Sequence, residues 1–124
     1  MNMNKKNRVS YENVKPYTTK DGSIIRELIH PNHMKVKNIS LAEAIVKPNE
    51  ETFLHIHKTS EEIYHITEGK GVMQLGDKTF EVKKGDSILI PPKTPHKIKN
   101  NSQEELKILC ICSPPYSHED TELL

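Results

Sequence analysis

The sequence predicts an all-β domain, either an antiparallel sandwich or a barrel, and two observations support this. First, no window keeps the i, i+3, i+4, i+7 apolar spacing of an amphipathic helix. Second, short runs with strand-like composition recur along the chain, separated by glycine, proline, asparagine and aspartate. Many short strands at this spacing are typical of antiparallel sandwiches and barrels.

Nine runs are expected to form strands: residues 24–29, 41–46, 52–57, 63–67, 72–75, 80–82, 87–90, 96–98 and 106–111. The segment Leu75-Gly76-Asp77-Lys78 predicts a tight hairpin between two of them, because glycine adopts a positive φ at little cost.

The two ends of the chain differ in composition from the segment between them. Residues 1–20 are rich in asparagine and lysine, and we expect a mobile arm or a segment that a partner orders. Residues 113–124 form a tail whose first part is too proline-rich and polar for a strand. A solvated terminus is expected there, with a lid formed by residues 116–120 as the alternative. Residues 21–112 are therefore expected to be a single domain.

Composition excludes several classes of protein. The chain has 124 residues, which fits one domain, and a formal net charge of +1. That charge argues against a general electrostatic affinity for nucleic acid or an anionic membrane. No stretch approaches the roughly 20 apolar residues of a membrane span. The first ten residues lack the apolar segment of a secretory signal, so the cytoplasm is the expected compartment.

The segment after residue 52 suggests a metal site. His55 and His57 are two residues apart in an expected strand, so their side chains share one face. Glu62 begins the next run, and an antiparallel neighbour can bring its carboxylate opposite the pair. His96 opens a later strand. Three imidazoles and one carboxylate suit a divalent transition metal ion: Mn, Fe, Ni, Cu, Co or Zn.

These residues carry a family resemblance. Residues 48–69 and 85–100 resemble the two conserved motifs of the cupin superfamily. The first reads His55-x-His57-x4-Glu62-x6-Gly69, and the second reads Gly85-x5-Pro91-x4-His96-x3-Asn100. The resemblance implies a jelly-roll barrel, or double-stranded β-helix, with one metal ion inside it, held by His55, His57, Glu62 and His96. Some cupins keep the barrel and lose the metal.

The sequence departs from the second motif at Lys93, where the family usually has glycine. We expect this change to alter the turn before His96 and to place an ammonium group at the barrel mouth. Candidates for an acid or base are Tyr64, Lys93, Cys110 and Cys112, chosen by position alone.

The two cysteines are close to each other near the end of the chain. On one strand, Cys110 and Cys112 would form a strained disulfide, so free thiols in a reducing compartment are expected. They are expected to face inward, where they touch a substrate, act as auxiliary soft ligands or, more simply, are small core residues.

Other side chains are assigned to one face by alternation. Phe53 shares the parity of His55, and Tyr64 that of Glu62, so both are expected to face the cavity. His65 falls on the opposite parity, outside the site. His30, His33 and His118 also lie off the motifs.

Two functions remain open at this point. The resemblance implies a metal-dependent enzyme that acts on a small polar or anionic molecule, of the dioxygenase, decarboxylase, lyase or isomerase type. The alternative is a non-catalytic module that binds a metal or a small ligand.

We expect a homodimer that shares residues 24–29 and the N-terminal arm. Within that run, the charged pair Arg26-Glu27 protects an edge strand or forms a salt bridge between subunits. Alternatively, Arg26 meets an anionic substrate at the cavity mouth.

Overall fold

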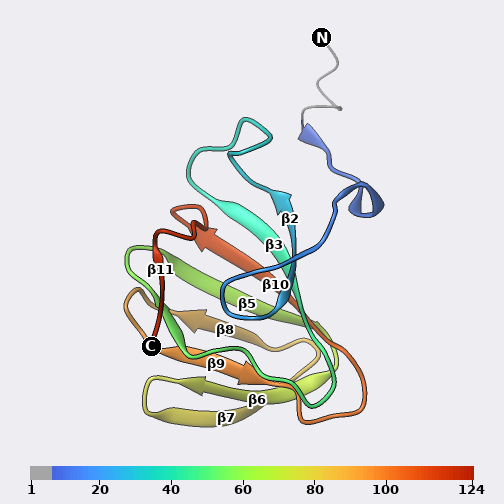
Figure 1. The fold of residues 1–124 in the computed structure, drawn as a ribbon, viewed down its shortest axis with the longest axis vertical. Helices are drawn as coiled ribbons and strands as arrows, with labels where there is room; N and C mark the ends of the chain where they lie inside the picture. Colours follow the sequence, from blue (N-terminus) through green and yellow to red (C-terminus); the bar gives the residue numbers. More distant parts are fainter. Residues whose placement is uncertain (1–6) are drawn as a thin grey trace.

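The computed structural model describes residues 7–124, which form two antiparallel sheets (Figure 1). A 3-10 turn, η1 (Tyr11–Asn13), precedes the first strand. The larger sheet has the strand order β1 (Tyr17–Thr18), β2 (Ile24–Ile29), β3 (Ser40–Val46), β10 (Leu106–Ser113), β5 (Glu61–Glu68) and β8 (Ser87–Ile90). The smaller sheet has the order β11 (Thr121–Leu123), β4 (His55–His57), β9 (His96–Lys99), β6 (Lys70–Leu75) and β7 (Lys78–Lys83). The all-β prediction is confirmed.

Each of the nine expected runs contains a strand. Runs 24–29 and 87–90 coincide with β2 and β8, and most others are extended by one or two residues at one or both ends. The run 52–57 is the exception, because β4 begins only at His55. The Thr52 and Phe53 N–H groups bond the carbonyls of Ile98 and Asp21, which turns the backbone before β4. Phe53 is consequently 59 % exposed, and its predicted place in the cavity is wrong.

The hairpin between β6 and β7 is confirmed. Leu75 pairs with Lys78, and Gly76 adopts a φ of 60°. The inward side chain on β6 is Met73, which is fully buried.

The inner face of the larger sheet changes from apolar to polar along its strands. On β10, Ile108 lies between Ala44 and Ile66, in a fully apolar row. Two residues further on, Cys110 lies between Ala42 and Tyr64. In the next row, Cys112 lies between Ser40 and Glu62. The apolar end packs against Met73 and Ile98 of the smaller sheet, so the core occupies one end of the barrel and leaves the other end to polar groups.

The C-terminal tail does not extend into solvent as expected. Residues 121–123 form β11, which pairs with β4. The Asp120 carboxylate accepts hydrogen bonds from the N–H groups of Thr59 and Ser60 and from the Thr59 hydroxyl. Polar residues that seemed unsuited to a strand thus bond the backbone of a neighbouring loop.

The expected N-terminal arm is described only from residue 7 onward. Its first six residues lie outside the described residues. Tyr17 and Thr18 form the short strand β1 against β2, and the Thr19 hydroxyl bonds the Tyr116 hydroxyl at 3.0 Å. The end of the expected arm is therefore part of the barrel. Within residues 7–124, no helix has the length and apolar character needed to cross a bilayer.

Lys93 adopts a backbone conformation in its turn that favours glycine. Its φ is 62°, in the left-handed region that glycine adopts without strain, and its N–H donates to the His57 carbonyl at 2.8 Å. A lysine in this conformation carries local backbone strain of about 1 kcal/mol. The Lys93 side chain is exposed and does not line the cavity.

Asn100 joins three segments at the apolar end of the barrel. Its side-chain N–H groups donate to the carbonyls of Val46 and Glu104, and its Oδ1 accepts from the N–H and hydroxyl of Ser102. Because Asn100 is fully buried, Asn100→Ala leaves these groups unpaired. We predict a loss of about 2–4 kcal/mol in the free energy of unfolding, measured by urea titration. The exposed neighbour Asn101→Ala is the control, and an equal loss in both variants would contradict the assignment.

Candidate metal centre

Three imidazoles meet at the polar end of the barrel. His55 and His57 lie one pleat apart on β4, and His96 is the first residue of β9, directly opposite His55. One ring nitrogen from each lies within 4.8 Å of the others. All three residues are at most 5 % exposed. The predicted shared face of His55 and His57 is confirmed.

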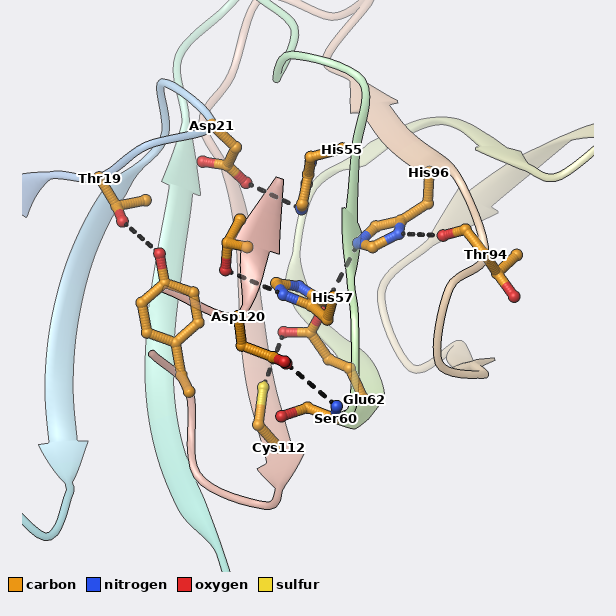
Figure 2. Close-up of polar contacts among 12 residues, drawn as sticks. Thr19, Asp21, His55, His57, Ser60, Glu62, Thr94, His96, Cys112 and Asp120 are labelled. Carbon is orange, nitrogen blue, oxygen red and sulfur yellow. Dashed lines mark hydrogen bonds and ion pairs between the residues drawn. The ribbon is translucent and has the colours of Figure 1, made fainter. Parts of the chain in front are cut away.

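Glu62 reaches this cluster from the facing sheet (Figure 2). Its Oε1 lies 3.0 Å from His57 Nε2 and 3.6 Å from His96 Nε2. The residue is 4 % exposed, so its carboxylate has little access to water. Antiparallel pairing with β10 places Glu62 opposite Cys112, whose thiol donates to Glu62 Oε2 at 3.3 Å.

The outer nitrogens of the imidazoles are held by neighbouring oxygens. His55 Nδ1 donates to the Phe53 carbonyl at 2.7 Å, and His96 Nδ1 donates to the Thr94 carbonyl at 2.9 Å. His57 Nδ1 lies 3.1 Å from the Thr121 hydroxyl oxygen. That hydroxyl donates to the Ser117 carbonyl and therefore accepts from the imidazole. Each ring consequently presents Nε2 to the centre, as in metal sites whose ligands are oriented by a second hydrogen bond.

The donor atoms fit one metal ion. Ligand atoms about 2.1 Å from an ion, at 90–110° to one another, are roughly 3.0–3.5 Å apart. The contacts of Glu62 Oε1 with the two imidazoles are close to this range. Among residues 7–124, Glu62 Oε1 and His96 Nε2 are also buried atoms without a hydrogen-bond partner. A buried acceptor without a donor is unfavourable, and a cation at this point would satisfy both atoms.

The acid–base properties of the cluster are consistent with this fit. Burial and the nearby His96 charge lower the pKa of His55, which favours the neutral imidazole that a metal requires. Burial alone would raise the pKa of Glu62, but His57 and His96 outweigh it and bring the value to about 2. Burial opposes protonation of His57, but the Glu62 carboxylate outweighs burial and raises the pKa of His57.

A small cavity of about 30 Å³ is lined by His55, His57 and Glu62 of this cluster. Of the four predicted acid–base candidates, Tyr64, Cys110 and Cys112 line it, and Lys93 does not. Burial raises the pKa of the Tyr64 hydroxyl and of both thiols, so all three groups keep their protons at neutral pH. The cysteines are free, as predicted.

Several cavity residues were not identified from the sequence. They come from the end of the expected arm, from the turn before β2, from β2 itself and from the expected tail: Thr19, Asp21, Glu27 and Thr121. Tyr116 also lines the cavity, where the alternative of a lid had placed residues 116–120. Asp21 Oδ2 lies 3.7 Å from His55 Nε2, and the Tyr116 and His57 ring centroids are 5.9 Å apart. No motif marked these residues, because segments distant in sequence bring them together.

The hypothesis that Arg26 meets a substrate is wrong, because the two charged residues of β2 face the other way round. Arg26 lies on the outer face, 3.6 Å from Glu43 and bonded to the Tyr11 hydroxyl. Glu27 faces the cavity instead. Strand β1 pairs with β2 only at Ile24 and Ile25, so it does not extend along the edge of β2 at Arg26 and Glu27. Strict alternation within the run 24–29 could have predicted that Ile25 and Glu27 share a face.

The remaining histidines lie off the cluster, as predicted. His65 bonds the Ser87 hydroxyl on the outer face. His30 accepts from the Asn32 N–H through Nδ1 and donates through Nε2 to the Tyr116 carbonyl at 2.8 Å. It therefore anchors the segment that closes the cavity.

Comparisons with known proteins identify the family. The cupin domain family matches residues 42–112. An uncharacterised protein of Methanocaldococcus jannaschii is 63 % identical over 117 residues, which cover 94 % of each chain.

Solved structures support the same assignment. The polyketide cyclase RemF from Streptomyces resistomycificus has a TM-score of 0.75 and 28 % identity, covering 91 % of this chain and 87 % of that one. A predicted oxalate decarboxylase from Thermotoga maritima shares the fold, with a TM-score of 0.74 and 24 % identity over 86 % of this chain and 97 % of that one. The predicted jelly roll, a double-stranded β-helix, is thus confirmed. With more than half of its residues matched, this chain belongs to the cupin domain family.

Proposed function

We propose that this protein is a metal-dependent enzyme that holds one divalent transition metal ion and acts on a small polar molecule. The proposed ligands are His55, His57, Glu62 and His96. The observation that carries this is the orientation of the three imidazoles, because an oxygen engages every Nδ1. Nε2 of His57 and of His96 lies near Glu62 Oε1, and the three histidines can bring one ring nitrogen each within 4.8 Å of one another.

Three nitrogen donors and one carboxylate suit Mn, Fe, Co, Ni, Cu or Zn. Such an ion acts as a Lewis acid that polarises a carbonyl or carboxylate oxygen. Enzymes such as the decarboxylase and cyclase types among the solved structures are consistent with this class of chemistry.

The chain's own residues close and orient the site. Tyr116 is held by the Thr19 hydroxyl, the Ser40 hydroxyl and the His30 imidazole, and its ring covers His57. This arrangement limits the access of water to the cavity. Within the cavity, the Cys112 thiol orients Glu62, while Tyr64 keeps its proton and acts as a hydrogen-bond donor rather than a base.

A non-catalytic binding module is the second candidate. The observation that favours it is that Tyr64, Cys110 and Cys112 all stay protonated at neutral pH, so none of them acts as a base there. If the metal-loaded protein converts any small molecule that binds through an oxygen atom, the protein is an enzyme and not a binding module. We also propose a cytoplasmic location, which the two free, buried thiols support.

We further propose a homodimer, supported by an apolar row on the outer face of the larger sheet. Leu89 pairs with Ile63, Ile63 with Ile111, and Ile111 with Leu41. Leu89 is 60 % exposed and Ile63 is 40 % exposed. Contiguous exposed apolar side chains mark interaction surfaces, and a second copy presents the same row. We therefore propose this surface as the dimer interface, in place of residues 24–29 and the N-terminal arm.

Metal content tests the proposed centre. Protein purified without a polyhistidine tag should contain about one equivalent of transition metal by elemental analysis. His57→Ala removes one of four ligands and should lower the metal affinity at least tenfold, while circular dichroism shows an unchanged barrel. His65→Ala, on the outer face, is the matched control. Equal metal content in His57→Ala and wild type would refute the ligand assignment.

Metal affinity should fall with decreasing pH. The pKa of His57 is raised above 6.5, so protonation of its imidazole competes with the metal below neutral pH. Glu62, with a pKa of about 2, stays ionised throughout this range. We predict that the apparent affinity for Zn(II) drops by at least tenfold between pH 7.5 and 5.5, measured by competition with a chelator of known pH dependence. A pH-independent affinity over this range would contradict histidine ligation.

The dimer is tested by light scattering after size exclusion. Wild type should have about twice the 14.2 kDa mass of one chain. Leu89→Lys places a charge in the apolar row and should yield monomer. Phe53→Lys, at an equally exposed apolar residue away from that row, should leave the dimer intact. A monomeric wild type would rule the proposal out.

A further inference from the structure

Glu27 is a charged residue inside the barrel that the proposed metal centre does not use. It lies on β2 in register with Ala42, which in turn is opposite Cys110 on β10. Two strand spacings, roughly 10 Å, therefore separate the backbone of Glu27 from that of Cys110. Because Ala42, which lies between them on β3, carries only a methyl group, the space above β3 on the inner face stays open. Glu27 lines the cavity beside the metal centre. It belongs to the larger sheet, whereas the three histidines lie on β4 and β9 of the smaller sheet.

The Glu27 carboxylate is only half satisfied. Its Oε1 accepts a hydrogen bond from the Tyr17 hydroxyl at 3.1 Å. Its Oε2 is buried and has no hydrogen-bond partner among residues 7–124. A buried carboxylate oxygen without a donor destabilises the fold, so the position is unfavourable unless a ligand donates to it.

Glu27 also stands where a ligand would enter. A second, larger cavity of about 280 Å³ lies on the outer side, and it shares Glu27 and Tyr116 with the inner cavity. A molecule that passes from this outer cavity toward His57 must therefore pass these two side chains.

The charge of the inner cavity is negative. Three carboxylates line it, from Asp21, Glu27 and Glu62, and no lysine or arginine of residues 7–124 does. A divalent cation would offset two of these charges and leave one. Such a cavity disfavours a dianion and favours a molecule with a hydrogen-bond donor or a positive charge at the end away from the metal.

We propose that Glu27 determines specificity by binding a hydroxyl or ammonium group of a small ligand, and that the cavity rejects dicarboxylates. The inference rests on the proposed function, because the other end of the ligand is to be held at the metal centre. It narrows the expected polar or anionic substrate to small molecules that carry a hydrogen-bond donor at the end away from their metal-binding oxygen.

Four small probes test this on protein loaded with Zn(II). Glycolate offers a hydroxyl, glycine offers an ammonium group, propionate is a similarly sized acid with neither, and oxalate is a dianion. Dissociation constants are measured by ligand-observed NMR at pH 7.5. Glycolate, glycine or both should bind at least tenfold more tightly than propionate and oxalate, the factor expected for a hydrogen bond to a charged group. The two donor probes show whether a hydroxyl or an ammonium group is preferred.

Variants of Glu27 locate the selectivity. Glu27→Leu should reduce every preference to less than threefold, whereas Glu27→Gln, which keeps an acceptor, should retain part of the glycolate preference and lose that for glycine. Glu61→Gln, an exposed carboxylate on β5, is the control and should behave as wild type. Unchanged selectivity in Glu27→Leu, or equal affinity of the wild type for all four probes, would overturn the proposal. So would a failure of all four probes to bind.

Stability provides a readout that needs neither metal nor ligand. Since Glu27 Oε2 is buried and unpaired, Glu27→Leu should raise the melting temperature of the metal-free protein by several degrees. A lower melting temperature would instead assign Glu27 a structural role. Metal content is measured in the Zn(II)-loaded samples used for the binding experiments. Absence of metal in the wild type refutes the proposed function, whereas bound metal without ligand selectivity refutes only the role of Glu27.

Discussion

The burial of Glu62 among three imidazoles is the constraint on which the polar end of this barrel depends. A carboxylate that is 4 % exposed is strongly unfavourable unless positive charge compensates it. The compensating groups come from the opposite sheet, since Glu62 lies on the larger sheet and the histidines on the smaller one. The cluster therefore ties the two layers together where the apolar core ends. A protein without a solid core at this end needs such a link to keep its sheets at a defined separation.

Much of the surrounding structure serves the orientation of these four side chains. The carbonyls of Phe53 and Thr94 hold two of the imidazoles, and the Thr121 hydroxyl holds the third. Thr121 belongs to the C-terminal strand, so the last residues of the chain contribute to the centre. The segment between β10 and β11 then covers the cavity through Tyr116. Fold and site are thus built from the same hydrogen bonds.

The strands and the shared face of His55 and His57 could be predicted from the sequence, because both depend on local spacing. His96 was added to this pair by the resemblance to the cupin motifs. Alternation placed His55 and His57 on one face, and turn residues marked the ends of most strands. The roles of the termini could not be predicted this way. Asp120 and Thr121 gain their partners from Thr59, Ser60 and His57, which are about 60 residues away in sequence. The polar character of these residues is evident from the sequence, but their hydrogen-bond partners are not.

The same reasoning explains why Glu27 was overlooked in favour of Arg26. Adjacent residues in a strand face opposite sides, so one member of the pair had to point inward, and the flanking isoleucines did not settle which one. The register does settle it: Glu27 aligns with Ala42, Cys110 and Tyr64, all on the inner face, whereas Arg26 aligns with Glu43 on the outer face. Alanine at position 42 matters as much as the charge itself, since a larger side chain would fill the space in front of the carboxylate. A small residue beside an unpaired acid, where the inner cavity adjoins the outer one, is an arrangement that packing alone does not favour. Its retention inside a compact barrel is best explained by a ligand that completes it.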